Sequence, residues 1–135
     1  MKKQTALILV FAILLYIAMP VAATDSSSTV QPRYTYIMDV SAGIEVSNLG
    51  VANCRGALIA KTIAPVKIVI RLQELDGSDW MTIKKWEITG SGSISASEDY
   101  AVYSGYSYRV HVTAYVYDAN GNVLESASES QYIDY

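Results

Sequence analysis

Two hydrophobic patterns follow one another along the chain. Near the start, an apolar run extends from Ala6 to Met19 and is broken only by Tyr16. From Tyr34 onward, apolar and polar residues alternate over short runs that end at Gly, Asn, Asp or Ser. Such runs, rich in β-branched and aromatic residues, are typical of strands in an antiparallel all-β domain. The runs are Tyr34–Val40, Gly43–Asn48, Val51–Ala60, Val66–Leu75, Trp80–Ile88, Ser93–Tyr103, Tyr106–Tyr117 and Asn122–Tyr132.

Alternation also assigns faces to the predicted strands, because successive side chains of a strand point to opposite sides of its sheet. Three sets are expected to face the core: Val66, Ile68, Ile70 and Leu72; Tyr106, Tyr108, Val110, Val112, Ala114 and Val116; and Ala52, Cys54, Gly56 and Leu58. The opposite sides are expected to meet water, and they carry Lys67, Val69, Arg71 and Gln73 in one strand and Ser107, Arg109, His111, Thr113, Tyr115 and Tyr117 in another.

Two segments between the runs favour tight hairpins, Asp76-Gly77-Ser78-Asp79 and Asp118-Ala119-Asn120-Gly121. Both contain residues that tolerate the positive φ such turns require. Seven or eight strands joined in this way predict an all-β fold, an antiparallel two-sheet sandwich of the immunoglobulin-like or fibronectin-like kind. One departure is clear: Cys54 has no partner, because Val110 and Val112 occupy the stretch where an antibody domain has its second cysteine.

The first 23 residues have the layout of a helical secretory signal peptide. Lys2 and Lys3 precede the apolar run, Pro20 ends it, and Val21-Ala22-Ala23 supplies the small residues that a signal peptidase reads, with cleavage after Ala23. The alternative is an uncleaved anchor helix, since 19 residues without a charge are just long enough to span a bilayer. Residues 24–32 are rich in Ser and Thr and predict a disordered spacer, which leaves 33–135 as the folded domain. We therefore expect a secreted or cell-surface protein that has no contact with the membrane after cleavage.

Charge and cysteine content narrow the possible partners. Without Lys2 and Lys3, the 10 Lys and Arg residues become eight against 13 Asp and Glu, a formal charge of −5. A balance of this sign argues against nucleic acid as a partner, because nucleic-acid binders carry a basic patch or stripe. The single cysteine cannot form an intramolecular disulfide, and its strand pattern predicts that it is buried.

The polar motifs do not combine into a catalytic or metal-binding site, so we expect no enzyme activity, no metal and no cofactor. His111 is the only histidine and lies on a wet strand face, with no recognisable acid–base pair beside a serine. Glu98 and Asp99 are adjacent in a strand and point to opposite faces, so they cannot join Glu87 as a carboxylate pair. The Asp118 turn has its glycine at the fourth position, whereas an EF-hand calcium loop has it at the sixth.

Aromatic residues are the most suggestive feature. Ten of the 11 tyrosines and both tryptophans lie beyond the leader. Tyrosine and tryptophan offer flat apolar faces with a polar tip, which suits stacking on sugars or contacts with proteins. The expected ligand-binding platform consists of Tyr115, Tyr117, Arg109, His111 and one of Trp80 or Trp86. The alternative is a purely structural role, in which these aromatic residues only form cross-strand pairs within the fold.

Three roles fit this sequence. The first is a non-enzymatic module that binds a glycan or a protein through the aromatic platform. The second is a structural or self-assembling surface protein that pairs through exposed strand edges, at Tyr34–Val40 or Asn122–Tyr132. The third is a secreted effector.

Several segments resemble a group of small exported proteins from Gram-positive anaerobes, a domain family of unknown function. They are Arg33-Tyr34-Thr35-Tyr36-Ile37, Ala52-Asn53-Cys54, Leu72-Gln73, Trp80 to Trp86, and the block from Tyr106 to Gly121. The resemblance implies an exported single-domain protein. It implies no activity, ligand or site residues.

Overall fold

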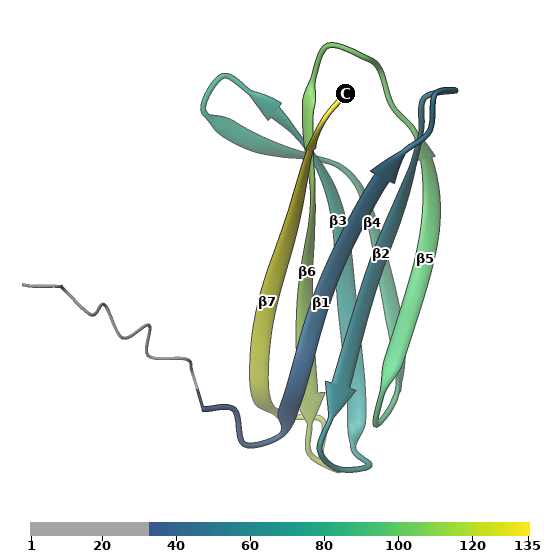
Figure 1. Cartoon of the computed structure of the whole chain (residues 1–135). Coiled ribbons are helices and arrows are strands. Elements are labelled where there is room, and N and C mark those ends of the chain that lie inside the picture. Colours follow the sequence, from purple (N-terminus) through teal and green to yellow (C-terminus); the bar gives the residue numbers. More distant parts are fainter. Residues whose placement is uncertain (1–32) are drawn as a thin grey trace, which may run out of the picture. The chain divides into compact units, whose positions relative to one another are not determined.

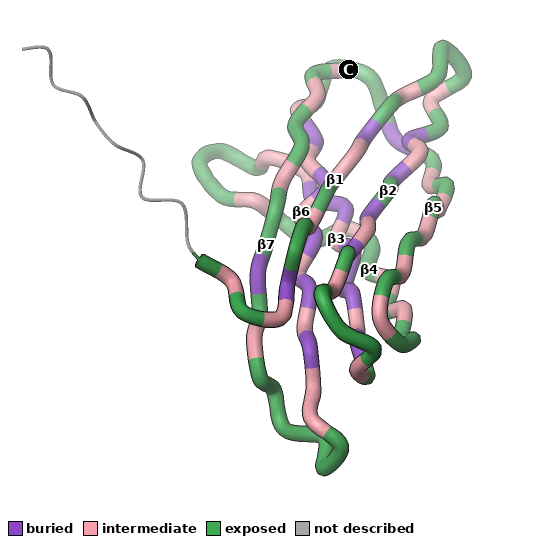
Figure 2. The backbone as a smooth tube through the Cα atoms, turned by 60° about the horizontal axis from the view of Figure 1, so that its bottom comes forward, coloured by how far each residue is buried: buried purple, intermediate pink, exposed green. Residues whose placement is uncertain are grey.

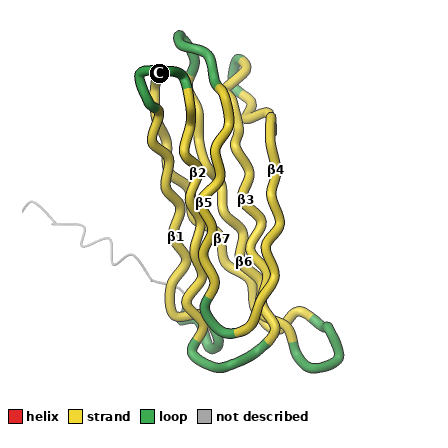
Figure 3. Tube along the Cα trace, turned by 90° about the vertical axis from the view of Figure 1, so that its right-hand side faces the viewer, coloured by secondary structure: helices red, strands yellow, loops and turns green. Residues whose placement is uncertain are grey.

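The computed structural model describes residues 33–135, and the predicted signal peptide and spacer lie outside these residues. The described part consists of strands and loops only (Figure 3). The strands are β1 (Ile37–Val46), β2 (Val51–Ala60), β3 (Pro65–Asp76), β4 (Asp79–Ser91), β5 (Ile94–Ala101), β6 (Ser107–Tyr117) and β7 (Val123–Asp134). They form a three-stranded sheet in the order β1-β2-β5 and a four-stranded sheet in the order β4-β3-β6-β7, with antiparallel pairing throughout (Figure 1). The predicted two-sheet antiparallel fold is confirmed.

The first two predicted runs form one strand, so the sandwich has seven strands. The residues between the two runs, Ser41 and Ala42, continue the ladder with β2, and β1 is irregular only between Ile37 and Asp39. Ser41 is the one turn-forming residue type between the runs, and it is not enough to end the strand there. Both predicted hairpins are present, and each has a glycine with positive φ, Gly77 at 63° and Gly121 at 84°.

The core lies between the two sheets, and buried positions alternate with less buried ones along β2 and β6 (Figure 2). The predicted inner residues of β2 and β3 are all buried, and Cys54 is among them. Tyr106 was expected in the core and is 48% exposed, because it precedes β6 and its backbone pairs with Tyr135. Val69 and Gln73 were expected to be exposed to solvent, yet they are only 3% and 8% exposed. Both lie on the central strand β3, which has a neighbouring strand on each side, β4 and β6.

Side-chain hydrogen bonds fix both ends of the sandwich. At one end, the carboxylate of Glu125 in β7 accepts from the backbone N–H groups of Thr35, Tyr36 and Ile37 at 2.7–2.8 Å. At the other end, the buried Tyr108 hydroxyl donates to the carbonyl of Tyr103 at 2.9 Å and accepts from its N–H at 3.1 Å. The start of β1 is therefore tied to β7, and the loop between β5 and β6 is tied to the first residues of β6.

No helix with the length and apolar character of a membrane span occurs in the described residues.

Candidate functional site

The outer face of the four-stranded sheet carries the outward side chains of β6 from Ser107 to Tyr117 and their neighbours on β3, β4 and β7; we call it the aromatic–basic face. A bulge shapes one end of it. Leu72 pairs with Lys84, but the next residue, Gln73, pairs with Thr82, so Ile83 is an extra residue in β4. Bulges bend a strand and increase its twist. Beyond this point the β3–β4 hairpin leans away from the body of the sandwich (Figure 1).

The bend brings together residues from opposite edges of the sheet. Trp80 belongs to β4 and Tyr132 to β7, and three strand spacings would separate them by about 14 Å in a flat sheet. Instead their ring centroids are 5.6 Å apart with an edge-to-face geometry. The guanidinium of Arg109 lies between the strands that carry them, 4.7 Å from the Trp80 centroid and 5.9 Å from that of Tyr132. Its Nε donates to Oε1 of the buried Gln73 at 2.7 Å.

These four residues, Trp80, Arg109, Tyr132 and Gln73, are here called the Trp80 cluster. Its rings remain accessible: Tyr132 is 56% exposed, and Trp80 is partly exposed. Because Gln73 and the two rings hold Arg109, the cluster is ordered before any ligand arrives. A preordered group loses less side-chain entropy when it binds.

A polar row crosses the sheet next to the cluster. His111 is the register partner of Arg71 on β3 and of Ser130 on β7. Its Nδ1 lies 2.7 Å from the Ser130 hydroxyl oxygen. Nη1 of Arg71 donates to Oγ1 of Thr113 at 3.1 Å. Burial lowers the pKa of His111, and the nearby charges of Arg109 and Arg71 lower it further, against an opposing effect of Glu129.

The remaining predicted site residues do not join this cluster. Tyr115 and Tyr117 lie on the same face with ring centroids 6.3 Å apart, and the ammonium of Lys67 is 5.4 Å from the Tyr115 centroid. They are about 20 Å and 26 Å along β6 from Arg109, because a strand rises about 3.3 Å per residue. Trp86 points to the other side of the sheet, where it packs edge-to-face on Tyr100 at 6.4 Å. The platform therefore divides into two aromatic ends of one face, and Trp86 belongs to neither.

The contact between Ser130 and His111 is a pair that the sequence analysis did not find. Two features of a hydrolytic site are not found around it among the described residues. In residues 33–135 no carboxylate hydrogen-bonds the His111 ring, and the backbone N–H of Ser130 donates to the Glu129 carboxylate at 3.0 Å. A nucleophilic serine needs a base that is oriented by an acid and also needs free N–H donors for the oxyanion. The pair instead fixes the orientation of the imidazole ring.

The acidic motifs make contacts within the fold. The Asp118 carboxylate accepts from the backbone of Asn120 and Asn122 and from the Asn122 side chain, so the turn itself uses its oxygens. Glu87 pairs with Lys85 at 2.9 Å and with Lys67 at 3.9 Å. Within the described part of the chain, no three His, Cys, Asp or Glu side chains are grouped in a way that could hold a metal ion.

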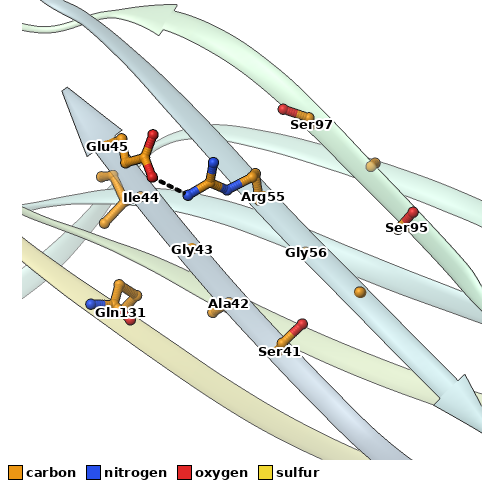
Figure 4. Close-up of a pocket in the computed structure, with 12 residues that line it drawn as sticks. Ser41, Ala42, Gly43, Ile44, Glu45, Arg55, Gly56, Ser95, Ser97 and Gln131 are labelled. Atoms are coloured by element: carbon orange, nitrogen blue, oxygen red, sulfur yellow. Dashed lines mark hydrogen bonds and ion pairs between the residues drawn. The ribbon is translucent and has the colours of Figure 1, made fainter. Parts of the chain in front are cut away.

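The other sheet has an open depression of about 670 Å³, and most of its lining comes from small residues of β1, β2 and β5 (Figure 4). Its charged groups, Arg55 and Glu45, pair with each other at 2.6 Å across one end. The rest of the lining consists of serines, glycines, alanines, Ile44 and Gln131, with no aromatic ring and no further charged group. The aromatic–basic face is therefore the better candidate for a binding site.

No model of a known protein family matches this sequence, and no curated protein matches it.

Proposed function

We propose that the protein is an exported, non-enzymatic binding module that works at or outside the cell surface and holds a glycan or protein ligand on the aromatic–basic face. The observation that carries this proposal is the Trp80 cluster, in which Trp80, Arg109 and Tyr132 are drawn together from three strands. Export is inferred from the predicted leader. The resemblance to exported proteins of Gram-positive anaerobes agrees with it.

The residue types support binding. Trp, Tyr and Arg are the residues that contribute most to binding at protein interfaces, and aromatic rings also stack on the apolar faces of sugars. An exposed tyrosine beside a tryptophan would be a liability on a surface with no partner. The cluster also depends on a bulge in β4, the longest of the described strands. A simple cross-strand pair of aromatic residues needs no bulge.

We also propose that the fold is immunoglobulin-like, closest to the fibronectin-type arrangement. The separation of β1, β2 and β5 from β4, β3, β6 and β7 supports this assignment. So does Tyr108, which lies near the start of β6 and hydrogen-bonds back to the chain upstream, as the tyrosine corner of such domains does. Domains of this architecture serve many unrelated functions, so the argument for binding rests on the face alone.

Substitution of Trp80 tests the proposal. The purified protein and its Trp80→Ala variant are screened on a glycan array and in pull-downs from the native envelope. The matched control is Tyr103→Ala, which removes an aromatic ring that is 78% exposed and lies outside the cluster. We expect the ligand to bind about 30-fold more weakly to Trp80→Ala and unchanged to the control. Equal binding by wild type and Trp80→Ala, with both folded by circular dichroism, would contradict the proposal.

A second candidate function is self-assembly through strand edges. Both edges named from the sequence belong to edge strands, β1 and β7, and these two strands lie beside each other on one side of the sandwich (Figure 1). Met38, Val123 and Leu124 on these strands are 63%, 53% and 42% exposed. Sedimentation velocity over a range of protein concentrations tests this alternative, and a clean monomer at the highest concentration would rule against it.

A further inference from the structure

The positive charges of the domain are concentrated on one face. Of the eight Lys and Arg residues between 33 and 135, four project from the aromatic–basic face, namely Lys67, Arg71, Lys85 and Arg109. Strand β7 contributes mainly hydroxyls to this face, because its register aligns Ser126, Ser128 and Ser130 with the outward residues of β6. The acids that share the face are Asp134, which accepts from the Ser107 hydroxyl at one end, and Glu87 of β4, which pairs with Lys67 and Lys85. Glu125 and Glu129 have the opposite parity in β7. The domain as a whole carries 12 acidic residues over the same range, so this segregation runs against its net charge.

Two of these cations have no anionic partner in the domain. The ion pairs among residues 33–135 join Arg55 to Glu45, Lys67 to Glu87 and Lys85 to Glu87. Arg71 and Arg109 take part in none of them, and their side chains donate hydrogen bonds to the neutral oxygens of Thr113 and Gln73. Arg71 and Arg109 lie on adjacent strands in diagonal register, which separates such residues by about 7 Å.

The two guanidinium groups flank His111 from two directions. Arg71 is its register partner on β3, and Arg109 is two residues away on the same face of β6. Lys85 of β4 is the register partner of Arg71 in the sheet. On the β7 side of His111, Ser130 contacts the imidazole. Glu129 is the acidic residue whose charge raises the pKa of His111. Its position in β7 directs its side chain to the opposite face of the sheet. Like charges this close on a half-buried surface repel one another, and a bound anion would reduce the repulsion.

We propose that Arg71, Arg109 and His111 form an anion subsite that binds the carboxylate groups of an acidic polysaccharide, while Trp80 and Tyr132 stack on a neighbouring sugar ring. This inference rests on the proposed binding function and names its ligand class. The planar guanidinium suits a carboxylate because it can donate two parallel hydrogen bonds. The serine and threonine hydroxyls between the strands add donors and acceptors for sugar hydroxyls.

The position of the subsite favours a polysaccharide over an acidic peptide. Peptides that bind to sheets usually add a strand at an edge, where unpaired backbone groups are available. Arg71 and Arg109 lie on β3 and β6, the two central strands, whose backbone groups pair with neighbours on both sides. A ligand above them can use only side chains, and the side chains offered are charges, hydroxyls and aromatic rings. Those groups match a sugar chain that carries carboxylates.

His111 provides a direct reporter, because it is the only histidine in the chain. The imidazole resonance of the full-length protein is followed by NMR as oligogalacturonate is added, and separately as its methyl ester is added, which is the same oligosaccharide without charge. We expect the charged form to shift the resonance and to raise the pKa of His111, because a bound anion offsets the effect of the two arginines. The methyl ester should do neither, and added salt should weaken binding of the charged form.

Two variants assign the effect to the arginines. Arg71→Gln and Arg109→Gln should each weaken oligogalacturonate binding about tenfold. The matched control, Arg55→Gln on the other sheet, should leave the affinity unchanged. Thermal unfolding checks that each variant is folded, and the His111 resonance of the free variants should titrate at a higher pH than in the wild type because a nearby positive charge has been removed.

The possible results separate this inference from the proposed function. Binding of the methyl ester as tightly as the acid, with loss in Trp80→Ala, would keep the binding module and overturn the anion subsite. Tighter binding of polyglutamate than of oligogalacturonate would overturn the assignment to polysaccharide. If neither oligogalacturonate nor oligoglucuronate moves the His111 resonance at millimolar concentration, the subsite does not bind carboxylated sugars.

Discussion

A close approach between β2 of one sheet and β3 and β6 of the other predicts a large effect from a small substitution, Gly56→Ala. Gly56 faces inward from β2, and a Cβ at this position would lie 2.8 and 2.9 Å from Cγ1 and Cδ1 of Ile70 and 3.0 Å from Cγ2 of Val112. Carbon atoms pack at about 3.5–4.0 Å, so the sheets or the two side chains would have to move by about 0.5–1 Å. Glycine at this position thus lets the sheets meet.

The expected cost combines two opposing terms. Overpacking a core by one methyl group costs about 1–3 kcal/mol. Alanine also limits the unfolded chain more than glycine does, which stabilises the folded state by about 0.5–1 kcal/mol. We therefore expect a net loss of about 1–2 kcal/mol in the free energy of unfolding, measured by urea denaturation. In a domain of this size the midpoint of thermal unfolding should fall by about 4–8 °C.

Gly43→Ala is the matched control. Gly43 lies in the same sheet, and the nearest atom to its added Cβ would be Nε of Arg55 at 3.1 Å, on a flexible side chain outside the core. This change should alter stability by less than about 0.5 kcal/mol. Ile70→Val removes the Cδ1 atom, so the cost of Gly56→Ala should be smaller in that background. If Gly56→Ala is as stable as Gly43→Ala, the sheets do not approach each other as closely as described.

Two further predictions concern titratable groups. Burial raises the pKa of Glu125, but hydrogen bonds from the backbone N–H groups of residues 35–37 outweigh this effect, and the folded-state pKa lies below the ordinary value of 4.5. The stabilisation is therefore complete above about pH 4.5 and is lost as the pH falls through the folded-state pKa. Glu125→Gln should lower the free energy of unfolding by about 1 kcal/mol, measured by urea denaturation at pH 7. The difference from wild type should shrink at acidic pH. Burial, helped by the charge of Asp99, raises the pKa of Cys54 to about 12, so a thiol reagent should label the native protein only as fast as it unfolds; rapid native labelling at pH 8 would contradict the burial of Cys54.

Local sequence patterns were enough to predict the strands, because each strand and its turns are encoded within a few residues. Alternation also placed Arg109, His111, Tyr115 and Tyr117 on one outer face, which the structure confirms. It could not predict which strands are neighbours. The proximity of Arg71 and His111 depends on pairing between β3 and β6, which are distant in sequence.

The two tryptophans show where alternation fails. Trp80 and Trp86 are six residues apart, so a regular strand would place both on the same face. The extra residue at Ile83 reverses the parity between them. As a result Trp80 reaches the outer face and Trp86 packs on Tyr100 at the inner one. The position of a bulge depends on how the hairpin packs. No residue in Leu72-Gln73 or Thr82-Ile83 predicts it.

Net charge and local charge also lead to different conclusions about partners. Eight cations against 12 acids over residues 33–135 would repel a polyanion at long range. Within a screening length of about 8–10 Å, however, a ligand on the aromatic–basic face meets the unpaired cations Arg71 and Arg109, and Lys85 with its partner Glu87. Duplex DNA carries one charge per about 1.7 Å and depends on many such contacts. An acidic polysaccharide has at most about one charge per sugar, so a few arginines, aided by stacking on Trp80 and Tyr132, suffice to hold it. The proposed anion subsite is therefore compatible with the prediction that nucleic acid is not a partner.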